Sequence, residues 1–219
     1  MMSIASRVAG LMLALSGAAT AFGQTRGDTA QANAMARAAD FGFERVANNG
    51  GAATGTSLGS GPTDWACTRH TVTGLVWEVK LATPGALRSA GSTYSWLSGV
   101  AASNGGQAGV ADGGSCSGSV CDTQAYVAAV NALALCGFTD WRLPTRHELA
   151  FIVRQGAVGS GSATVNPAFF PNTRPADYWT GTNFAGNPEL AWLVSFNAGA
   201  TVYDKKSAPK HVMLVRGAP

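Results

Sequence analysis

The sequence predicts an α+β domain of two helices, several short strands and long loops, held together by disulfides. Three observations favour this class. Apolar residues recur at helical spacing after Asp122, and Thr145 with Glu148 forms the capping box of a second helix. The C-terminal part instead has short apolar runs separated by Gly and Asn, which is typical of strands joined by turns. Four cysteines complete the pattern.

The first 23 residues predict a cleaved secretory signal. Arg7 gives a positive start, an apolar run follows over residues 8–21, and Ala19-Thr20-Ala21 offers a small-residue cleavage pattern. The alternative is an uncleaved membrane anchor, for which the run is short, because a span needs about 20 apolar residues. We therefore expect a periplasmic, secreted or cell-surface protein with no membrane span after cleavage.

The remaining chain predicts one domain, because about 195 residues suit a single sizeable core. Residues 24–62, rich in Ala and then in Gly, Ser and Thr, predict a flexible lead-in to a domain over residues 63–219. Without Arg7 the balance is 14 basic against 12 acidic residues, which is too near neutral to indicate a nucleic-acid partner.

The chain before the first predicted helix is expected to form strands and loops. Residues 41–46 form a possible first strand, and residues 65–80 form a strand pair that turns near Thr73 and Gly74. Residues 98–119 are Gly-rich and predict a long surface loop, of the kind that is usually functional or disordered in a compact domain.

Two helices and a group of strands follow. The first helix covers residues 122–136, with Asp122 or Thr123 as N-cap and Gly137 as the stop. The second helix starts at Thr145. Strands are expected at residues 178–181, 191–196, 200–203 and 211–216, with a hairpin turn at Asn197-Ala198-Gly199.

Four cysteines in an exported chain indicate two disulfides, and three pairings are possible. A helix of about 15 residues would place Cys121 and Cys136 roughly 22 Å apart, whereas a disulfide needs Cα atoms within about 7 Å. Pairing Cys116 with Cys136 would stretch the loop back along the whole helix. We therefore favour Cys67–Cys136 and Cys116–Cys121. Zinc is the alternative, but no second close pair of ligands accompanies Cys116 and Cys121.

One set of motifs resembles a known family. These motifs are Trp65-Ala66-Cys67, Thr73-Gly74-Leu75-Val76-Trp77-Glu78, Asp140-Trp141-Arg142-Leu143-Pro144-Thr145, Phe170-Pro171-Asn172-Thr173, Tyr178-Trp179 and Val215-Arg216. Together, over about residues 64–217, they are similar to the Lcl C-terminal domain family, named for the Legionella collagen-like protein and regarded as a domain of unknown function. The resemblance implies a C-type-lectin-like fold with a small irregular antiparallel sheet and long loops on one side. The chain has no Gly-X-Y run, so binding that depends on collagen repeats is not implied.

Several motif residues are interpreted as structural, namely Trp77, Trp141, Arg142, Thr145 and Glu148. We expect Trp141 in the core, Arg142 hydrogen-bonded to backbone or a carboxylate at the corner before the second helix, and Glu148 as a helix cap. No nucleophile motif stands between a strand and a helix, and disulfide-bonded cysteines are not reactive thiols. The sequence therefore predicts no enzyme, no cofactor and no metal.

The loop at residues 180–190 is one candidate ligand-binding site. Asn183, Asn187 and Glu189, together with Asp177, could supply oxygens to calcium, which takes about six to eight of them. The order of these residues differs from that of sugar-binding C-type lectins, and a polar surface loop is the alternative.

A basic cluster near the C-terminus is the other candidate site. Lys205, Lys206 and Lys210, with His211 and Arg216, could bind polyanions such as glycosaminoglycans or lipopolysaccharide. Alternation along a strand would put some of them on opposite faces, so a solvated strand edge is the alternative.

The function expected is an exported, non-enzymatic binding or adhesion module. Its ligand, a surface glycan or polyanion, would meet the loops at residues 180–190 and 98–119, because binding residues concentrate on loops held by a rigid scaffold. The alternative is a structural or accessory component of an envelope or pilus-type assembly that contacts another envelope protein. An enzyme would need a deep pocket with a carboxylate or histidine of shifted pKa.

Overall fold

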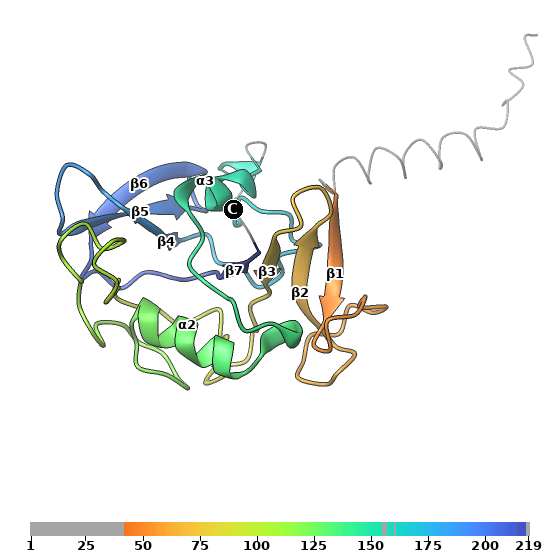
Figure 1. Ribbon diagram of the computed structural model, residues 1–219. Coiled ribbons are helices and arrows are strands. Elements are labelled where there is room, and N and C mark those ends of the chain that lie inside the picture. The colour runs from red at the N-terminus through yellow and green to blue at the C-terminus, as the bar shows by residue number, and fades with distance from the viewer. Residues whose placement is uncertain (1–41, 155–156, 160, 218–219) are drawn as a thin grey trace, which may run out of the picture. The chain divides into compact units, whose positions relative to one another are not determined.

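The computed structural model describes residues 42–154, 157–159 and 161–217, so the predicted signal at residues 1–23 lies outside the described residues. Within these residues the fold is α+β, with two helices and two small antiparallel sheets (Figure 1). The helices are α2 (Thr123–Ala132) and α3 (Arg146–Phe151), and a 3-10 turn, η1, covers Leu135–Gly137. The strands are β1 (Phe43–Ala47), β2 (Trp65–His70), β3 (Val76–Glu78), β4 (Asp177–Asn183), β5 (Leu190–Ser195), β6 (Ala200–Lys205) and β7 (Val215–Arg216).

The first sheet has the antiparallel order β1-β2-β3-β7. The predicted turn between β2 and β3 is present, and Gly74 at φ +72° supplies a left-handed backbone that other residues rarely adopt. β1 confirms the possible first strand at residues 41–46, since it pairs with β2 and buries Phe43 and Val46. The fold therefore begins before residue 63.

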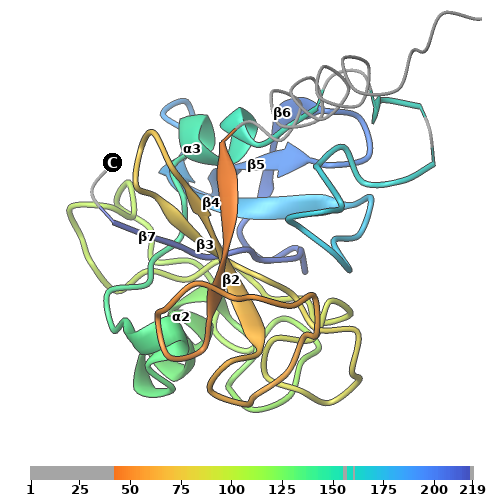
Figure 2. The ribbon, with the colours of Figure 1, turned by 90° about the vertical axis from the view of Figure 1, so that its right-hand side faces the viewer.

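The second sheet has the antiparallel order β4-β5-β6 and is separate from the first (Figure 2). The predicted hairpin joins β5 to β6, where the Gly199 N–H donates to the Ser195 carbonyl at 2.8 Å. The structure has two sheets where a single small sheet was expected. Of residues 211–216, which were expected to form one strand, only Val215–Arg216 form β7, and β7 pairs with β3 of the first sheet. Val212 and Met213, adjacent in this segment, belong to two different core clusters, so the segment is buried on both sides.

Helix α2 begins as predicted but ends early. Asp122 caps it by accepting the Ala125 N–H at 2.8 Å. The helix ends at Ala132 instead of Cys136, because Ala134 and Cys136 both have left-handed backbone, at φ 49° and 54°. These two residues form the turn that brings Cys136 to β2.

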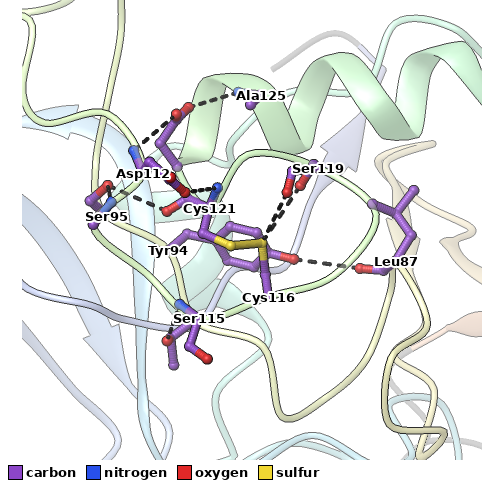
Figure 3. The surroundings of a disulfide bond; sticks show 12 residues. Leu87, Tyr94, Ser95, Asp112, Ser115, Cys116, Ser119, Cys121 and Ala125 are labelled. Atoms are coloured by element: carbon purple, nitrogen blue, oxygen red, sulfur yellow. Dashed lines mark hydrogen bonds between the residues drawn. A yellow bond between two sulfur atoms is a disulfide. The ribbon is translucent and has the colours of Figure 1, made fainter.

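Both favoured disulfides are present. Cys67–Cys136 joins β2 to η1 across 69 residues and is fully buried. Cys116–Cys121 closes a loop of 5 residues' separation and is half-buried (Figure 3). Next to it, the Asp112 carboxylate accepts the Cys121 N–H at 3.0 Å. The prediction of a short-range and a long-range disulfide is confirmed.

The core has two parts, and in both views α2 and α3 lie on opposite sides of β3 and β7 (Figures 1 and 2). One part includes Trp96, Trp141 and Trp179 together with apolar residues of α2, and the other includes Trp77 together with Leu149 of α3. No helix in the described ranges has the length and apolarity that a membrane crossing requires.

The core also contains a buried ionic group. The Lys80 ammonium donates to the Tyr126 hydroxyl at 2.9 Å, and that hydroxyl donates to both carboxylate oxygens of Glu78, at 3.0 and 2.9 Å. Burial lowers the pKa of Lys80, although the ion pair with Glu78 opposes this change. These polar groups satisfy one another, as buried charges must.

Candidate functional site

The corner before α3 is braced by Arg142, as expected. Arg142 donates to both carboxylate oxygens of Glu148, at 2.9 and 2.8 Å, and to the Gly217 carbonyl at 3.0 Å. Trp141 is buried, and its indole N–H donates to the Leu135 carbonyl at 3.1 Å. Trp141 and Arg142 therefore hold the fold and do not form an exposed binding pair.

The C-terminal lysines do not form the exposed basic patch that the polyanion hypothesis requires. Lys206 is fully buried. Lys210 lies between Asp177 and Asp204, at 3.1 and 2.9 Å. Burial would lower the pKa of Lys210, but the hydrogen bonds to the two carboxylates raise it above its ordinary value. Of the three lysines, Lys205 is the exposed one, at the end of β6.

Arg216 and His211, the other two basic residues of the cluster, also contact groups of the protein itself. Arg216 forms two hydrogen bonds with the Asp140 carboxylate, at 2.9 and 2.8 Å, and lies over the Phe138 ring. His211 is half-buried and contacts the Ser92 carbonyl through Nδ1 at 2.8 Å. The basic cluster of the sequence is therefore dispersed in the structure.

The four oxygen donors that were considered for calcium do not converge. Asp177 and Asn183 stand at opposite ends of β4, about 20 Å apart along an extended strand. Asn187 accepts the Glu189 N–H at 2.9 Å in a local turn. Within the described ranges, no three His, Cys, Asp or Glu side chains are grouped as metal ligands.

The loop at residues 180–190 forms part of a hollow of about 600 Å³ beside the start of α3. We call it the aromatic hollow, and its lining includes Arg146, His147, Thr182, Asn183, Phe184 and Trp192. Phe184 and Trp192 form an aromatic cluster with Tyr203, with ring centroids 4.3 to 5.6 Å apart. Phe184 and Trp192 are half-buried and Tyr203 is 51% exposed, so part of this aromatic surface is open to solvent.

The β5–β6 hairpin explains why these rings meet. Its register places Trp192 opposite Tyr203, and side chains opposite each other in an antiparallel pair share a face. Val194 also lies on this face and packs in the same cluster as Leu149 of α3. The rings therefore stand on the face that α3 partly covers, next to its first residues.

Arg146 adds a polar group to the aromatic surface. Its guanidinium carbon lies 4.9 Å from the centre of the Trp192 ring, a cation–π contact. Its backbone N–H donates to the Thr182 hydroxyl at 3.1 Å, which fixes the start of α3 against β4. Arg146 forms no ion pair with any described residue, so its planar set of donors faces no carboxylate.

The Gly-rich loop lies against one wall of the aromatic hollow. The Asn183 amide donates to the Ser103 carbonyl. The Lys206 ammonium donates to the Asn104 and Gln107 carbonyls, at 2.8 and 2.6 Å. The Asn183 Oδ1 atom is buried and has no hydrogen-bond partner among the described residues. The two loops that were expected to meet the ligand are thus in contact.

A smaller polar hollow of about 320 Å³ bears on the enzyme alternative, because Asp177, Ser195 and His211 line it. These residue types can form a catalytic triad. However, the His211 Nδ1 atom contacts the Ser92 carbonyl, and the Asp177 carboxylate binds Lys210. Burial lowers the pKa of His211. These contacts are not those of a base held by Asp177 to activate Ser195.

A comparison with protein-family models decides the relationship that the motifs suggested. The model described as the Lcl C-terminal domain matches residues 66–216. The chain belongs to the Lcl C-terminal domain family. Neither the curated proteins nor the solved structures contain a match to this chain.

The match to the Lcl C-terminal domain includes the aromatic hollow and all four cysteines, whereas β1 precedes it. Sequence reasoning identified the 180–190 loop and Asn183 but missed the aromatic cluster and Arg146. The hairpin turn was a usable signal, because pairing outward from Asn197-Ala198-Gly199 places Trp192 opposite Tyr203. No local pattern indicated the contact of Arg146 with Trp192.

Proposed function

We propose that this member of the Lcl C-terminal domain family is an exported, non-enzymatic module that binds carbohydrate in the aromatic hollow. We further propose that its fold is C-type-lectin-like, as the family resemblance implies. One observation carries the functional proposal. The half-exposed rings of Phe184 and Trp192 line the hollow beside the exposed His147 ring and the Arg146 guanidinium, which forms no ion pair with any described residue.

The chemistry of the hollow suits a sugar ring. The C–H groups on one face of a pyranose are weakly positive and pack on the negative face of an aromatic ring. Sugar hydroxyls need donors and acceptors nearby, which the Arg146 guanidinium and the exposed His147 ring can supply. Small-molecule sites generally combine aromatic walls with a few placed polar groups in this way.

Two features support export to the periplasm or cell surface. Disulfides form and persist in oxidising compartments outside the cytoplasm, and this chain has two. The N-terminal residues also have the charged start, apolar run and small-residue cleavage pattern of a secretory signal.

The test is a glycan array of immobilised hexopyranose oligosaccharides, probed with the oxidised protein. We expect binding that Trp192→Ala and Phe184→Ala each weaken about tenfold, because both rings line the hollow and losing one stacked ring removes about 1 kcal/mol or more. Phe151→Ala is the control, because Phe151 is an exposed aromatic residue that does not line the hollow, whereas Phe184 and Trp192 do. Equal effects of all three substitutions would refute the proposal.

The second candidate function is a component of an envelope assembly. It is favoured by Val202 and Tyr203, which are 39% and 51% exposed on β6, at the edge of the second sheet. Exposed edge strands can pair with other chains. An array with no bound glycan, together with an oligomer that Val202→Glu dissociates in analytical ultracentrifugation, would establish this function instead.

A further inference from the structure

Lys206 is the most unusual charge near the aromatic hollow. Its side chain is 1% exposed, and no carboxylate among the described residues pairs with it. Burying an ammonium without a counter-ion is expensive unless each of its donors is satisfied. Here two donors reach the carbonyls of Asn104 and Gln107, and the ammonium lies 4.2 Å from the centre of the Trp96 ring.

Both hydrogen bonds hold one segment, residues 98–110 of the Gly-rich loop. The segment contains no helix or strand of its own, so its ordering is entropically unfavourable. Backbone hydrogen bonds such as Ser98 N–H to Ala108 carbonyl, at 2.8 Å, close it as a loop. Lys206 connects the inside of that loop to the end of β6.

The tip of the loop touches the wall of the aromatic hollow. Ser103, directly before Asn104, accepts the Asn183 amide through its carbonyl. A Cβ at Gly105 would lie 3.3 Å from Cγ of Asn183, so the backbone packs closely there and leaves little room for a side chain. The position of residues 103–105 therefore sets the orientation of the Asn183 side chain.

We propose that Lys206 is a positioning residue for the aromatic hollow, which holds residues 98–110 in place and thereby fixes Asn183 in the wall of the site. The effect of Lys206 on ligand affinity rests on the proposed carbohydrate-binding function, whereas its role in holding residues 98–110 does not. Lys206 touches no ligand in this scheme, in contrast to the direct polyanion contact that the sequence suggested. Burial lowers the pKa of its ammonium, which agrees with a cation held by neutral carbonyls.

The test compares Lys206→Met with Lys205→Met in the full oxidised protein. Both remove one positive charge from neighbouring residues, but Lys205 is exposed, whereas the Lys206 ammonium is the one that donates to the loop carbonyls of Asn104 and Gln107. Hydrogen–deuterium exchange at the protected amides of Ser98, Gln107 and Val110 is the first readout. Affinity for the best-bound oligosaccharide of the hexopyranose array is the second.

We expect Lys206→Met to speed exchange at these amides about tenfold or more, because it removes two charge-assisted hydrogen bonds. In Lys206→Met, exchange in β5 should stay at the native rate and oligosaccharide affinity should fall. Lys206→Arg should show loop exchange and affinity closer to those of the native protein. Lys205→Met should change neither the loop exchange nor the affinity. Native exchange at these amides in Lys206→Met, or faster exchange throughout the domain, would overturn the proposal. A mobile loop with unchanged affinity would overturn the link to Asn183. If no oligosaccharide binds the native protein, the proposed function fails, while the exchange experiment still decides whether Lys206 holds the loop.

Discussion

At the scale of single residues, two buried tryptophans differ in what their polar atom meets. Trp77 and Trp141 are 0% and 2% exposed, so their packing is comparable. The Trp141 indole N–H donates to the Leu135 carbonyl at 3.1 Å. The Trp77 indole N–H has no hydrogen-bond partner among the described residues. The pair therefore separates the contribution of ring packing from that of the hydrogen bond.

We predict that Trp141→Phe destabilises the protein by about 1 kcal/mol more than Trp77→Phe, the net contribution of one hydrogen bond. Both substitutions remove similar ring volume, but Trp77→Phe also removes an unsatisfied buried donor. Urea unfolding of the oxidised variants, monitored by circular dichroism, gives both values. Equal destabilisation would mean that the Leu135 contact contributes nothing to the free energy of unfolding.

At the scale of elements, α3 is too short to be stable alone. It has six residues, and isolated helices shorter than about 12 residues are marginal in water. Its first turn is held by the reciprocal hydrogen bonds of Thr145 and Glu148, at 3.2 and 2.7 Å, and by the bidentate contact of Glu148 with Arg142. Because Arg146 is the first residue of α3, the hydrogen bonds that cap this helix also hold Arg146 in the wall of the aromatic hollow.

The pH dependence of stability should reveal this cap. Burial would raise the pKa of Glu148, but hydrogen bonds from Arg142 and Thr145 outweigh it, and the pKa is lowered. A carboxyl with a lower pKa in the folded state stabilises the fold above its unfolded pKa and loses that contribution as pH falls through the folded pKa. We predict that Glu148→Gln lowers the free energy of unfolding by about 1–2 kcal/mol at pH 7. The difference from the native protein should shrink towards pH 3, as measured by urea unfolding across this range. A constant difference would exclude the ionised cap as its source.

The elements that could be predicted from the sequence are those that local chemistry determines. The capping box, the turn at Gly74 and the β5–β6 hairpin each depend on a few adjacent residues, and all three are present. The early end of α2 was missed because Ala134 and Cys136 adopt left-handed backbone, and neither is a Gly or Asn, the residues that usually indicate this conformation. The separation into two sheets was missed because it depends on which strands pair, and that is a non-local choice.

The candidate site shows the same division. The loop at residues 180–190 was predicted from its oxygen-bearing side chains, and it does line a hollow. Lys205 and Lys206 look equivalent in the sequence, yet one is exposed and the other is buried under the Gly-rich loop. The contact of Arg146 with Trp192 joins residues that only the tertiary fold brings together.

At the scale of the whole molecule, the two disulfides act on different parts of the unfolding equilibrium. Cys67–Cys136 connects β2, in the first sheet, to the turn after α2, and its sequence separation is 69 residues. Cys116–Cys121 spans 5 residues at the surface. A disulfide stabilises mainly by restricting the unfolded chain, and this effect grows with the logarithm of the loop length.

We therefore predict that replacing Cys67 and Cys136 by Ser costs about 2 kcal/mol more than replacing Cys116 and Cys121, from loop length alone. Both thiol pairs are removed completely, so each double variant is the control for the other, and urea unfolding gives the comparison.

Mild reductant followed by alkylation and mass spectrometry should also label Cys116 and Cys121 first, because they are half-buried while the other pair is fully buried. Simultaneous labelling of all four cysteines would show instead that reduction requires global unfolding. Selective labelling would leave Cys67–Cys136 intact while the Gly-rich loop is released from the Cys116–Cys121 disulfide at its C-terminal end. Glycan binding by this form would then show how much the disulfide contributes to holding the loop, separately from Lys206.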